Sequence, residues 1–310
     1  MDPKISIVIP VYNEEESVFP LYKQITEAME KYNLSHELIL VDDGSSDSTF
    51  LHLEKIAMSD SKVKVIKLKM NSGQTAALHA GFENAVGEII VSMDGDLQND
   101  PDDIDKFIRK IEEGYDIVVG WRHNRHDYLI TRKIPSLIAN GLIRKVTGIP
   151  VRDNGCALRA YRRELIMKIP LYSEMHRLLP VITALSGARF TQLEVKHHAR
   201  QFGHSKYGLS RIYKVLFDIT ALKTYLSSFY IPLFGFGFFS LFFGFLCIIT
   251  FIITMMMIAL MPNPNLIIVI GIGLLFGEFS AFLFSLGLIC HLIYGSGNLK
   301  IEKLYRTKIK

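Results

Sequence analysis

Cysteine is scarce in this sequence, which contains only Cys156, Cys247 and Cys290 among its 310 residues. Their spacing does not match that of a cysteine-based metal site, and two of the three fall in strongly apolar stretches. We therefore expect free thiols in a reducing compartment, and we exclude a metal centre built on cysteine.

Charge is missing from much of the C-terminal third. No charged residue occurs in 229–261, and only Glu278 and His291 interrupt the apolar stretch 266–294. A membrane-spanning helix needs roughly 20 apolar residues, so each stretch is long enough to cross a bilayer. The alternative is a pair of buried core helices, but soluble helices of this length usually have a polar face. We therefore predict a transmembrane hairpin over 229–294.

The net charge is only +4, but basic residues flank the predicted hairpin on both sides, and its loop at 262–265 (PNPN) has no charge. The positive-inside rule then places both chain ends in the cytoplasm.

A signal peptide is not expected, because the first apolar run is short and preceded by an acid. We expect a cytoplasmic α/β domain at 1–208, an amphipathic segment at 209–228 and a basic tail at 295–310. The amphipathic segment fits either an interfacial helix or a helix packed on the domain, and the adjacent spans favour the first.

Two nucleotide-binding signatures are also missing. No G-x-G-x-x-G follows an early strand, and no G-x-x-x-x-G-K-[ST] phosphate loop occurs. The glycine-rich GIGLLFG at 271–277 lies in the second predicted span, where small residues serve helix packing. These absences argue against a dinucleotide-binding domain and a P-loop nucleotidase.

The first 120 residues contain an alternation of short apolar runs with amphipathic segments. This alternation is typical of an α/β protein with a doubly wound, mostly parallel sheet. The expected strands cover 5–9, 37–41, 63–68, 88–93 and 116–120, and the expected helices cover 15–32, 47–58, 73–86 and 101–113. Ligands of such sheets bind beyond the carboxyl ends of the strands, so functional side chains are expected there.

Polar residues follow four of these strands, in the segments PVYNEEE, VDDGSSDST, MDGDLQ and GWR. A single polar turn would be routine, since Asp, Ser and Gly form capped strand-to-helix turns by themselves. Four polar turns at one edge of a sheet predict a binding site instead. In VDDGSSDST, the functional alternative to a capped turn is a carboxylate that accepts hydrogen bonds from a nucleotide's base or ribose.

Asp94, Asp96 and Gln98 allow three interpretations: an EF-hand calcium loop, a site for a divalent cation, or an ordinary acidic turn. The EF-hand fails, because Asn99 and Asp105 stand where it requires glycine and glutamate. A D-x-D pair after a strand suits Mg²⁺ or Mn²⁺ held by carboxylates and substrate phosphates. The other polar strand ends favour this cation site over the plain turn.

Five segments in this order resemble a known family: IVIPVYNEEESV, LILVDDGSSDST, NSGQTAALHAGFENAVGEIIVSMDGDLQNDPDDI, GYDIVVGWR and RQFGHSKYG. Together they resemble the inverting family 2 glycosyltransferases, within these most closely the polyprenyl-phosphate glycosyltransferases of the dolichol-phosphate mannose synthase type. The resemblance covers about residues 4–228. It implies a GT-A fold, which is a Rossmann-like doubly wound sheet, followed here by an interfacial helix and the membrane hairpin.

The resemblance also implies a function, namely inverting transfer of a sugar from a UDP- or GDP-sugar to a polyprenyl phosphate. Undecaprenyl phosphate is the expected lipid, and the product would serve cell-envelope glycan or lipid modification on the cytoplasmic side of the membrane. The alternatives are a processive polysaccharide synthase and a non-catalytic membrane scaffold or flippase subunit. A synthase would carry a Q-x-x-R-W segment, whereas the only tryptophan here is Trp121 in GWR. We also expect contact with membrane lipid, a homo-oligomer, and no nucleic-acid partner.

The resemblance assigns roles to individual residues. The nucleotide-sugar site is expected to include Pro10, Tyr12, Asn13, Glu14, Asp42, Asp43, Gly73 and Asp94. The expected ligands of Mg²⁺ or Mn²⁺ are Asp94, Asp96 and Gln98. The expected catalytic residues are Asp96, Asp153, Arg122 and Arg200, and the expected contacts of the acceptor phosphate are Arg132, Lys133, His204, Ser205 and Lys206. Gly95 replaces the family's usual alanine, which implies a looser loop.

Some neighbouring residues have a plain structural explanation as well. Arg159, Arg162 and Arg163 are either site residues or surface charges. Glu174 and His176 either line the pocket or begin a capped helix.

Overall fold

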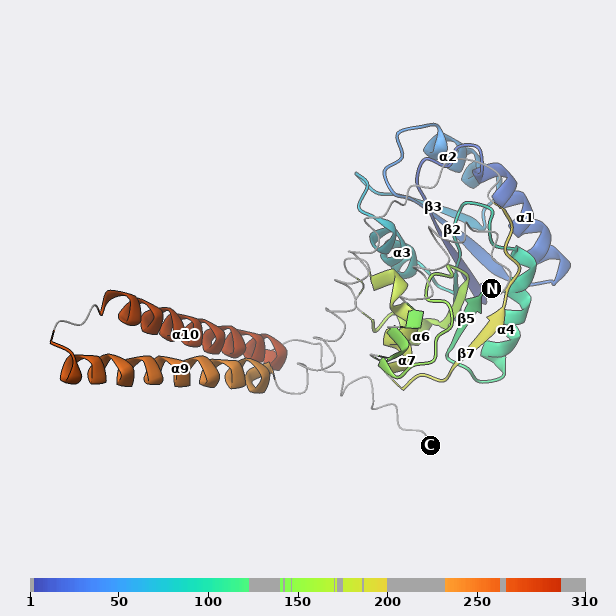
Figure 1. The fold of residues 1–310 in the computed structure, drawn as a ribbon. Coiled ribbons are helices and arrows are strands. Elements are labelled where there is room, and N and C mark those ends of the chain that lie inside the picture. The colour runs from blue at the N-terminus through green and yellow to red at the C-terminus, as the bar shows by residue number, and fades with distance from the viewer. Residues whose placement is uncertain are drawn as a thin grey trace. The chain divides into compact units, whose positions relative to one another are not determined.

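The computed structural model describes residues 3–122, 140–141, 143–145, 147–169, 171, 175–185, 187–199, 232–262 and 266–296. The chain forms two compact units, Met1–Ile219 and Thr220–Lys310 (Figure 1). The predicted amphipathic segment at 209–228 and most of the predicted tail at 295–310 lie outside the described residues.

A mixed sheet forms the centre of the first unit, with the strand order β3-β2-β1-β4-β6-β5-β7 (Figure 1). The strands are β1 (Ile5–Val11), β2 (His36–Asp42), β3 (Val63–Lys67), β4 (Ile89–Ser92), β5 (Ile117–Trp121), β6 (Arg159–Arg162) and β7 (Phe190–Glu194). Strands β1 to β4 pair in parallel, and β7 is parallel to β5. Of these strands only β6 is reversed, since it is antiparallel to both β4 and β5. The predicted mostly parallel α/β sheet is confirmed.

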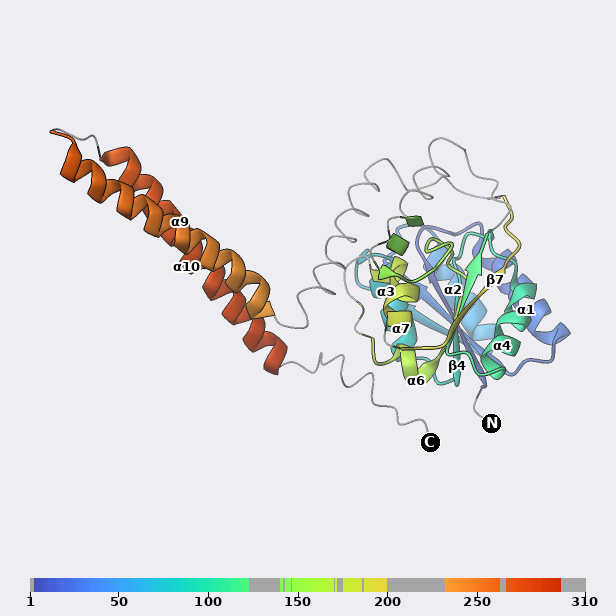
Figure 2. The same cartoon turned by 60° about the horizontal axis from the view of Figure 1, so that its bottom comes forward.

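Helices cover both faces of this sheet (Figure 2). One face carries α1 (Val18–Lys31), α2 (Thr49–Ser59), and α4 (Ile104–Glu112), which follows the short 3₁₀ turn η1 (Pro101–Asp103). The other face carries α3 (Gln74–Glu83), α6 (Arg163–Ile166) and α7 (Leu179–Leu185), and the turn η3 (Met175–Arg177) lies beside α3. The central strands are therefore shielded from water on both sides, which explains why they are almost continuously apolar.

Successive residues of a strand point to opposite faces of the sheet, so each strand contributes side chains to the packing against both helix layers. In β1, Ile7 and Ile9 belong to the core beneath α1, α2 and α4, whereas Val8 faces α3. Gly81 allows α3 to approach closely, because a Cβ atom there would lie 2.2 Å from Val8 Cγ1 and 3.2 Å from Val41 Cγ2. This close packing holds α3 against the sheet, and the first residue of α3, Gln74, is hydrogen-bonded to Asp94 after β4.

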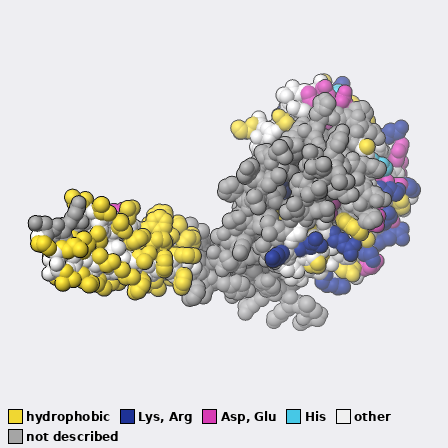
Figure 3. Space-filling view, in the orientation of Figure 1, with side chains coloured by type: hydrophobic (Ala, Val, Ile, Leu, Met, Phe, Trp, Pro, Cys, Tyr) yellow, Lys and Arg dark blue, Asp and Glu magenta, His cyan; other side chains and the backbone are white. Residues whose placement is uncertain are grey.

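The second unit is a pair of packed helices, α9 (Pro232–Leu260) and α10 (Ile267–Ser296). Their surfaces are covered by apolar side chains (Figure 3). Both are long and apolar enough to cross a membrane, with mean hydropathies of 2.6 and 2.3. Ser240 and Ser280 join them, since each hydroxyl donates to the backbone carbonyl of the other residue, at 2.9 and 2.8 Å. The exposed apolar surface fits lipid contact and does not fit the core of a soluble protein.

Glu37 is a buried carboxylate at the start of β2 that ties together neighbouring strands. It accepts hydrogen bonds from Ser6 Oγ at 2.5 Å and from the Val86 amide at 2.8 Å, and it pairs with Lys64 Nζ at 2.7 Å. Burial alone would raise the pKa of Glu37, but the contacts with Lys64, Ser6 and Val86 hold this pKa below its ordinary value.

We expect Glu37→Gln to lower the free energy of unfolding at neutral pH by about 1 kcal/mol, because the amide loses the charged part of these contacts. A carboxyl whose pKa is lowered by folding stabilises the protein above its unfolded pKa, and this contribution disappears as the pH falls through the folded pKa. The difference between wild type and variant should therefore shrink below about pH 4. Denaturation followed by the fluorescence of the single tryptophan, Trp121, measures this difference. A difference that stays constant into the acid range would contradict the expectation.

Candidate active site

The carboxyl ends of β1, β2 and β4 lie at one edge of the sheet, because these strands run in parallel. In the register of the sheet, Val11 of β1 pairs with Asp42 of β2, and Val8 pairs with Ser92 of β4. The turns that follow these strands contain the predicted polar residues. The predicted convergence of polar strand ends is therefore present in the structure.

The turns after β1 and β2 are locked together by hydrogen bonds between side chains and backbone. The backbone amide of Asn13 donates to Ser45 Oγ at 2.9 Å. The side-chain oxygen Oδ1 of Asn13 accepts from the backbone amide of Ser46, also at 2.9 Å. The Glu14 amide donates to Thr49 Oγ1 at 2.8 Å. Asn13 has a φ of 50°, a conformation that asparagine tolerates better than most residues. Asn13 and Glu14, both predicted at the nucleotide site, therefore also hold the two turns in place.

Asp42 and Asp43 are both buried, but they have different partners. Asp43 accepts hydrogen bonds from the backbone amides of Ser72, at 2.7 Å, and Gly73, at 2.9 Å. Asp42 Oδ1 accepts from the Ser45 amide at 3.1 Å, whereas its buried Oδ2 has no hydrogen-bond partner among the described residues. Burial raises the pKa of Asp43, the two amides oppose this shift, and the charge of Asp42 adds to it. Asp43 thus holds the chain before α3, and Asp42 has one buried carboxylate oxygen without a hydrogen-bond donor among the described residues.

The D-x-D loop, residues 94–98, packs directly on the end of β1. A Cβ atom at Gly95 would lie 2.8 Å from Val11 Cγ1 and 3.4 Å from the Pro10 carbonyl oxygen. Leu97 has a φ of 60°, and its side chain is only 2% exposed in the core. The close packing at Gly95 and the buried anchor at Leu97 make this loop tight, in contrast to the looser loop expected from the sequence.

The two carboxylates of this loop have defined neighbours. Asp94 Oδ1 accepts a hydrogen bond from Gln74 Nε2 at 2.7 Å, and Asp96 Oδ1 accepts one from the backbone amide of Gln98 at 3.2 Å. The Gln98 side chain donates to the His198 carbonyl oxygen at 3.4 Å. Within the described part of the chain, no cluster of three acidic, histidine or cysteine residues forms a ready-made metal cage. The oxygen donors of Asp94 and Asp96 fit a hard divalent cation that takes its other ligands from water and substrate phosphates.

The residues after the loop form a capped helix and exclude an EF-hand there. Asp100 Oδ1 accepts from the Asp102 amide at 3.0 Å and so caps η1. Asp105 pairs with Arg109 along α4, with 2.8 Å between Oδ2 and Nε. Neither carboxylate is turned toward a calcium loop, so the structure agrees with rejecting that interpretation.

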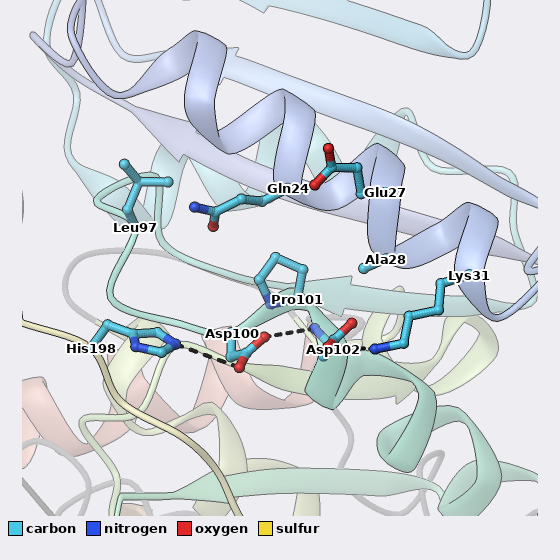
Figure 4. Close-up of a pocket in the computed structure, with 9 residues that line it drawn as sticks. All are labelled: Gln24, Glu27, Ala28, Lys31, Leu97, Asp100, Pro101, Asp102 and His198. Carbon is cyan, nitrogen blue, oxygen red and sulfur yellow. Dashed lines mark hydrogen bonds and ion pairs between the residues drawn. The ribbon is translucent and has the colours of Figure 1, made fainter.

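A hollow of about 360 Å³ lies beside the D-x-D loop, between α1 and the segment 97–102 (Figure 4). Two contacts join residues of its lining, since Lys31 Nζ lies 2.8 Å from Asp102 Oδ2 and His198 Nε2 lies 3.5 Å from Asp100 Oδ2. Burial alone would raise the pKa of Asp100, but hydrogen bonds from the Asp102 backbone amide, Lys196 and His198, together with the charge of Lys196, hold this pKa below its ordinary value. These contacts hold the segment that follows the D-x-D loop, with Lys31 of α1 bound to η1 and His198 bound to its cap.

Arg122 and Asp153 form a bidentate ion pair just beyond β5. Arg122 Nε lies 2.8 Å from Asp153 Oδ2, and Arg122 Nη2 lies 3.1 Å from Oδ1. The side chains are 14% and 4% exposed, and the Gly155 amide adds a hydrogen bond to Asp153 at 3.1 Å. Two predicted catalytic residues are thus brought together, and their geometry suits a fixed orienting pair better than a free base.

Arg159, for which the sequence left a surface charge as an alternative, is buried in β6. Its guanidinium donates to the carbonyl oxygens of Cys156 and Asn154, both at 2.7 Å, and to that of His176. His176 Nδ1 in turn lies 2.7 Å from Thr75 Oγ1, on the first turn of α3. The thiol of Cys156 is fully buried, and this burial raises its pKa to about 11, so it is not a nucleophile at neutral pH.

Gln74 and Thr75 were not predicted as site residues. The Gln74 side chain contacts the D-x-D loop, and the Thr75 side chain contacts η3. In the sequence they look like ordinary first-turn helix residues, and the only signal is that they follow Gly73 in NSGQTAAL. Pro10 and Tyr12 lie on either side of Val11, where β1 ends. The remaining predicted site residues, Arg132, Lys133, Glu174, Arg200, His204, Ser205 and Lys206, lie outside the described residues.

We expect Arg122→Met to lower the free energy of unfolding by about 3 kcal/mol, because it removes the bidentate partner of the buried Asp153 carboxylate. Replacing both residues, as Arg122→Met with Asp153→Leu, should cost clearly less than the sum of the two single changes. Urea denaturation in detergent measures all three variants, and Lys110→Met, in an exposed pair with Glu113, is a control that should change little. Losses that simply add would contradict a coupled pair.

Proteins of known name share much of this sequence. The chain is 43% identical over 227 residues to the dodecaprenyl-phosphate galacturonate synthase of Rhizobium johnstonii, covering 72% of this chain and 67% of that protein. It is 40% identical over 222 residues to the undecaprenyl-phosphate 4-deoxy-4-formamido-L-arabinose transferase of Salmonella choleraesuis, covering 71% of this chain and 68% of that protein.

Solved structures share the fold. The mannosyl-3-phosphoglycerate synthase of Rubrobacter xylanophilus matches with a TM-score of 0.59 at 16% identity, covering 73% of this chain and 75% of that one. The Mycobacterium tuberculosis glucosyl-3-phosphoglycerate synthase, in complex with Mn²⁺ and UDP-glucose, matches with a TM-score of 0.53 at 19% identity, covering 72% and 78%. The family model for glycosyl transferase family 2 matches residues 6–170, which include β1 from its second residue, β2 to β6 and the D-x-D loop. The chain therefore belongs to glycosyl transferase family 2.

Proposed function

We propose that this protein transfers a sugar from a nucleotide sugar to a polyprenyl phosphate at the cytoplasmic face of a membrane. The observation that carries the proposal is the D-x-D loop. It lies at the same sheet edge as the turns after β1 and β2, in a chain whose similar relatives are named for polyprenyl-phosphate products. The apolar helices α9 and α10 add a membrane anchor suited to a lipid acceptor.

The donor nucleotide would bind across the turns after β1 and β2. The unpartnered buried oxygen of Asp42 is suited to accept a hydrogen bond from a base N–H or a ribose hydroxyl. Tyr12 and Gly73 would line the same site, beside Pro10, Asn13 and Glu14. Asp43 would act indirectly, because its carboxylate already holds the amides of Ser72 and Gly73.

The diphosphate of the donor would lie at the D-x-D loop. Mg²⁺ or Mn²⁺, held there by Asp94 and Asp96 with Gln98 nearby, would neutralise charge on the departing nucleotide diphosphate. Asp94 accepts a hydrogen bond from Gln74, and the loop backbone is held by close packing at Gly95 and by the buried Leu97 side chain. Such preorganisation places the negative oxygens before the leaving group departs, so little rearrangement is needed during the reaction.

The reaction would be a single displacement with inversion. An oxygen of the lipid phosphate attacks the anomeric carbon, a new carbon–oxygen bond forms, and the bond to the nucleotide diphosphate breaks on the opposite side. The phosphate is already largely ionised near neutral pH, so a strong general base is not required. Arg122 and Asp153 would orient the acceptor, and Arg132, Lys133, Arg200, His204, Ser205 and Lys206 would offset the charge of the two phosphate groups.

The catalytic unit would lie in the cytoplasm, with both chain ends on that side and the hairpin tip at 262–265 on the other. Basic residues on both flanks of the hairpin and the uncharged PNPN loop support this orientation. Undecaprenyl phosphate is the acceptor we propose, and association of several copies through the apolar helices completes the proposal.

An assay with membranes, UDP- and GDP-sugars and undecaprenyl phosphate tests the proposed reaction. We expect a product in which one phosphate joins sugar and lipid, and we expect Asp96→Asn to lower its rate by on the order of 100-fold. Asp105→Asn, which alters an acid paired with Arg109 on α4, is the matched control and should keep its activity. A product joined through a diphosphate, or full activity of Asp96→Asn, would contradict the mechanism.

A labelling experiment tests the orientation. Asn263→Cys, in the predicted hairpin tip, should react with a membrane-impermeant maleimide in intact spheroplasts. Met58→Cys, at a position 86% exposed on the catalytic unit, should react only after the membrane is opened. The unmodified chain gives the background, and the reverse pattern would overturn the orientation.

A further inference from the structure

The start of α3 is held in place through the backbone amides of Ser72 and Gly73. Asp43 binds the amides of Ser72 and Gly73, and Gly73 has a φ of 90°, a conformation that favours glycine. The preceding residues press against the turn after β2, because a Cβ atom at Gly44 would lie 2.6 Å from the Met70 carbonyl carbon. The position of the first helical residue, Gln74, is therefore set by contacts that its own side chain does not make.

The first two side chains of α3 reach two different parts of the site. Gln74 Nε2 donates to Asp94 Oδ1 at 2.7 Å, across 20 positions of sequence. Thr75 Oγ1 lies 2.7 Å from His176 Nδ1, across 101 positions. Consecutive helix residues point about 100° apart, so one fixed helix start can hold both segments. Gln74 thus connects a rigid backbone position to the first carboxylate of the D-x-D loop.

A neutral amide is suited to this contact. A lysine here would cancel the charge of Asp94 and compete with a bound cation, and a glutamate would repel the carboxylate. Glutamine donates a hydrogen bond and leaves the negative charge available for a metal and a diphosphate. We infer that Gln74 is a positioning residue of the donor site, which holds the Asp94 carboxylate in the orientation that a divalent cation needs. This inference rests on the proposed function.

Binding of Mn²⁺ tests the inference without relying on turnover. Full-length protein in detergent is titrated with Mn²⁺ in the presence of excess UDP, and in a parallel series GDP, and bound ion is read from the loss of the free-ion EPR signal. We expect Gln74→Met, which keeps side-chain length and helix propensity, to raise the half-saturating Mn²⁺ concentration by on the order of tenfold. Gln24→Met makes the same change on α1 and should bind Mn²⁺ as the wild type does.

A double-substitution cycle separates positioning from a general structural effect. If Gln74 acts through Asp94, adding Gln74→Met to Asp94→Asn should cause no further loss of Mn²⁺ affinity. In the transfer assay, raising Mn²⁺ should restore most of the kcat of Gln74→Met, whereas damage to the fold would not respond to metal. Additive losses in the cycle, or a kcat that excess Mn²⁺ leaves unchanged, would overturn the inference.

The same titrations distinguish failure of the inference from failure of the proposed function. Weak binding by Asp94→Asn together with normal binding by Gln74→Met would overturn only the role of Gln74. Normal binding by Asp94→Asn, or no binding by the wild type with either nucleotide, would remove the metal role of the D-x-D loop and the inference with it.

Discussion

In β1, β2 and β4 the backbone runs in one direction, so the three turns that follow these strands meet at a single edge of the sheet. The turns after β1 and β2 are bonded to each other through Asn13 and Ser45, and Asp43 of the second turn also binds the Gly73 amide at the start of α3. Gln74, the next residue, bonds to Asp94 of the turn after β4. The D-x-D loop packs on the end of β1 at Gly95. A change in the path of any of these turns would therefore move the others, and the site behaves as one preorganised unit.

The acidic residues at this edge divide into two groups by their partners. Asp43 and Asp153 are engaged by backbone amides and by Arg122, respectively, so that they shape the site from within. Asp94 and Asp96 also accept hydrogen bonds, from the Gln74 side chain and the Gln98 backbone, and we propose that they bind a cation and a diphosphate. Buried carboxylates are costly unless they are hydrogen-bonded or paired, which explains why those that shape the site have strong partners. The arrangement suits a reaction that brings two phosphate-bearing molecules together.

The alternating strands and helices of the first 120 residues were predicted well from the sequence. Strands β1 to β5 and the helices between them appear close to their expected bounds, because apolar periodicity is a local property. The family and the α/β fold are confirmed, whereas the assigned roles of the site residues stay predictions. The partners of Asp43, Gln74 and Arg159 could not be predicted, since each reaches a segment that only folding brings near. Strands β6 and β7 were not predicted. Strand β6 is short and antiparallel to both of its neighbours, so it does not continue the alternation of parallel strands and helices.

The most direct measurement is a structure of the full-length protein with Mn²⁺ and a nucleoside diphosphate, in which anomalous scattering locates the metal. We expect one manganese peak bonded to a carboxylate oxygen of the D-x-D loop and to the diphosphate, with the base near Asp42. A diphosphate bound away from Asp94 and Asp96, or a metal held elsewhere, would contradict this expectation.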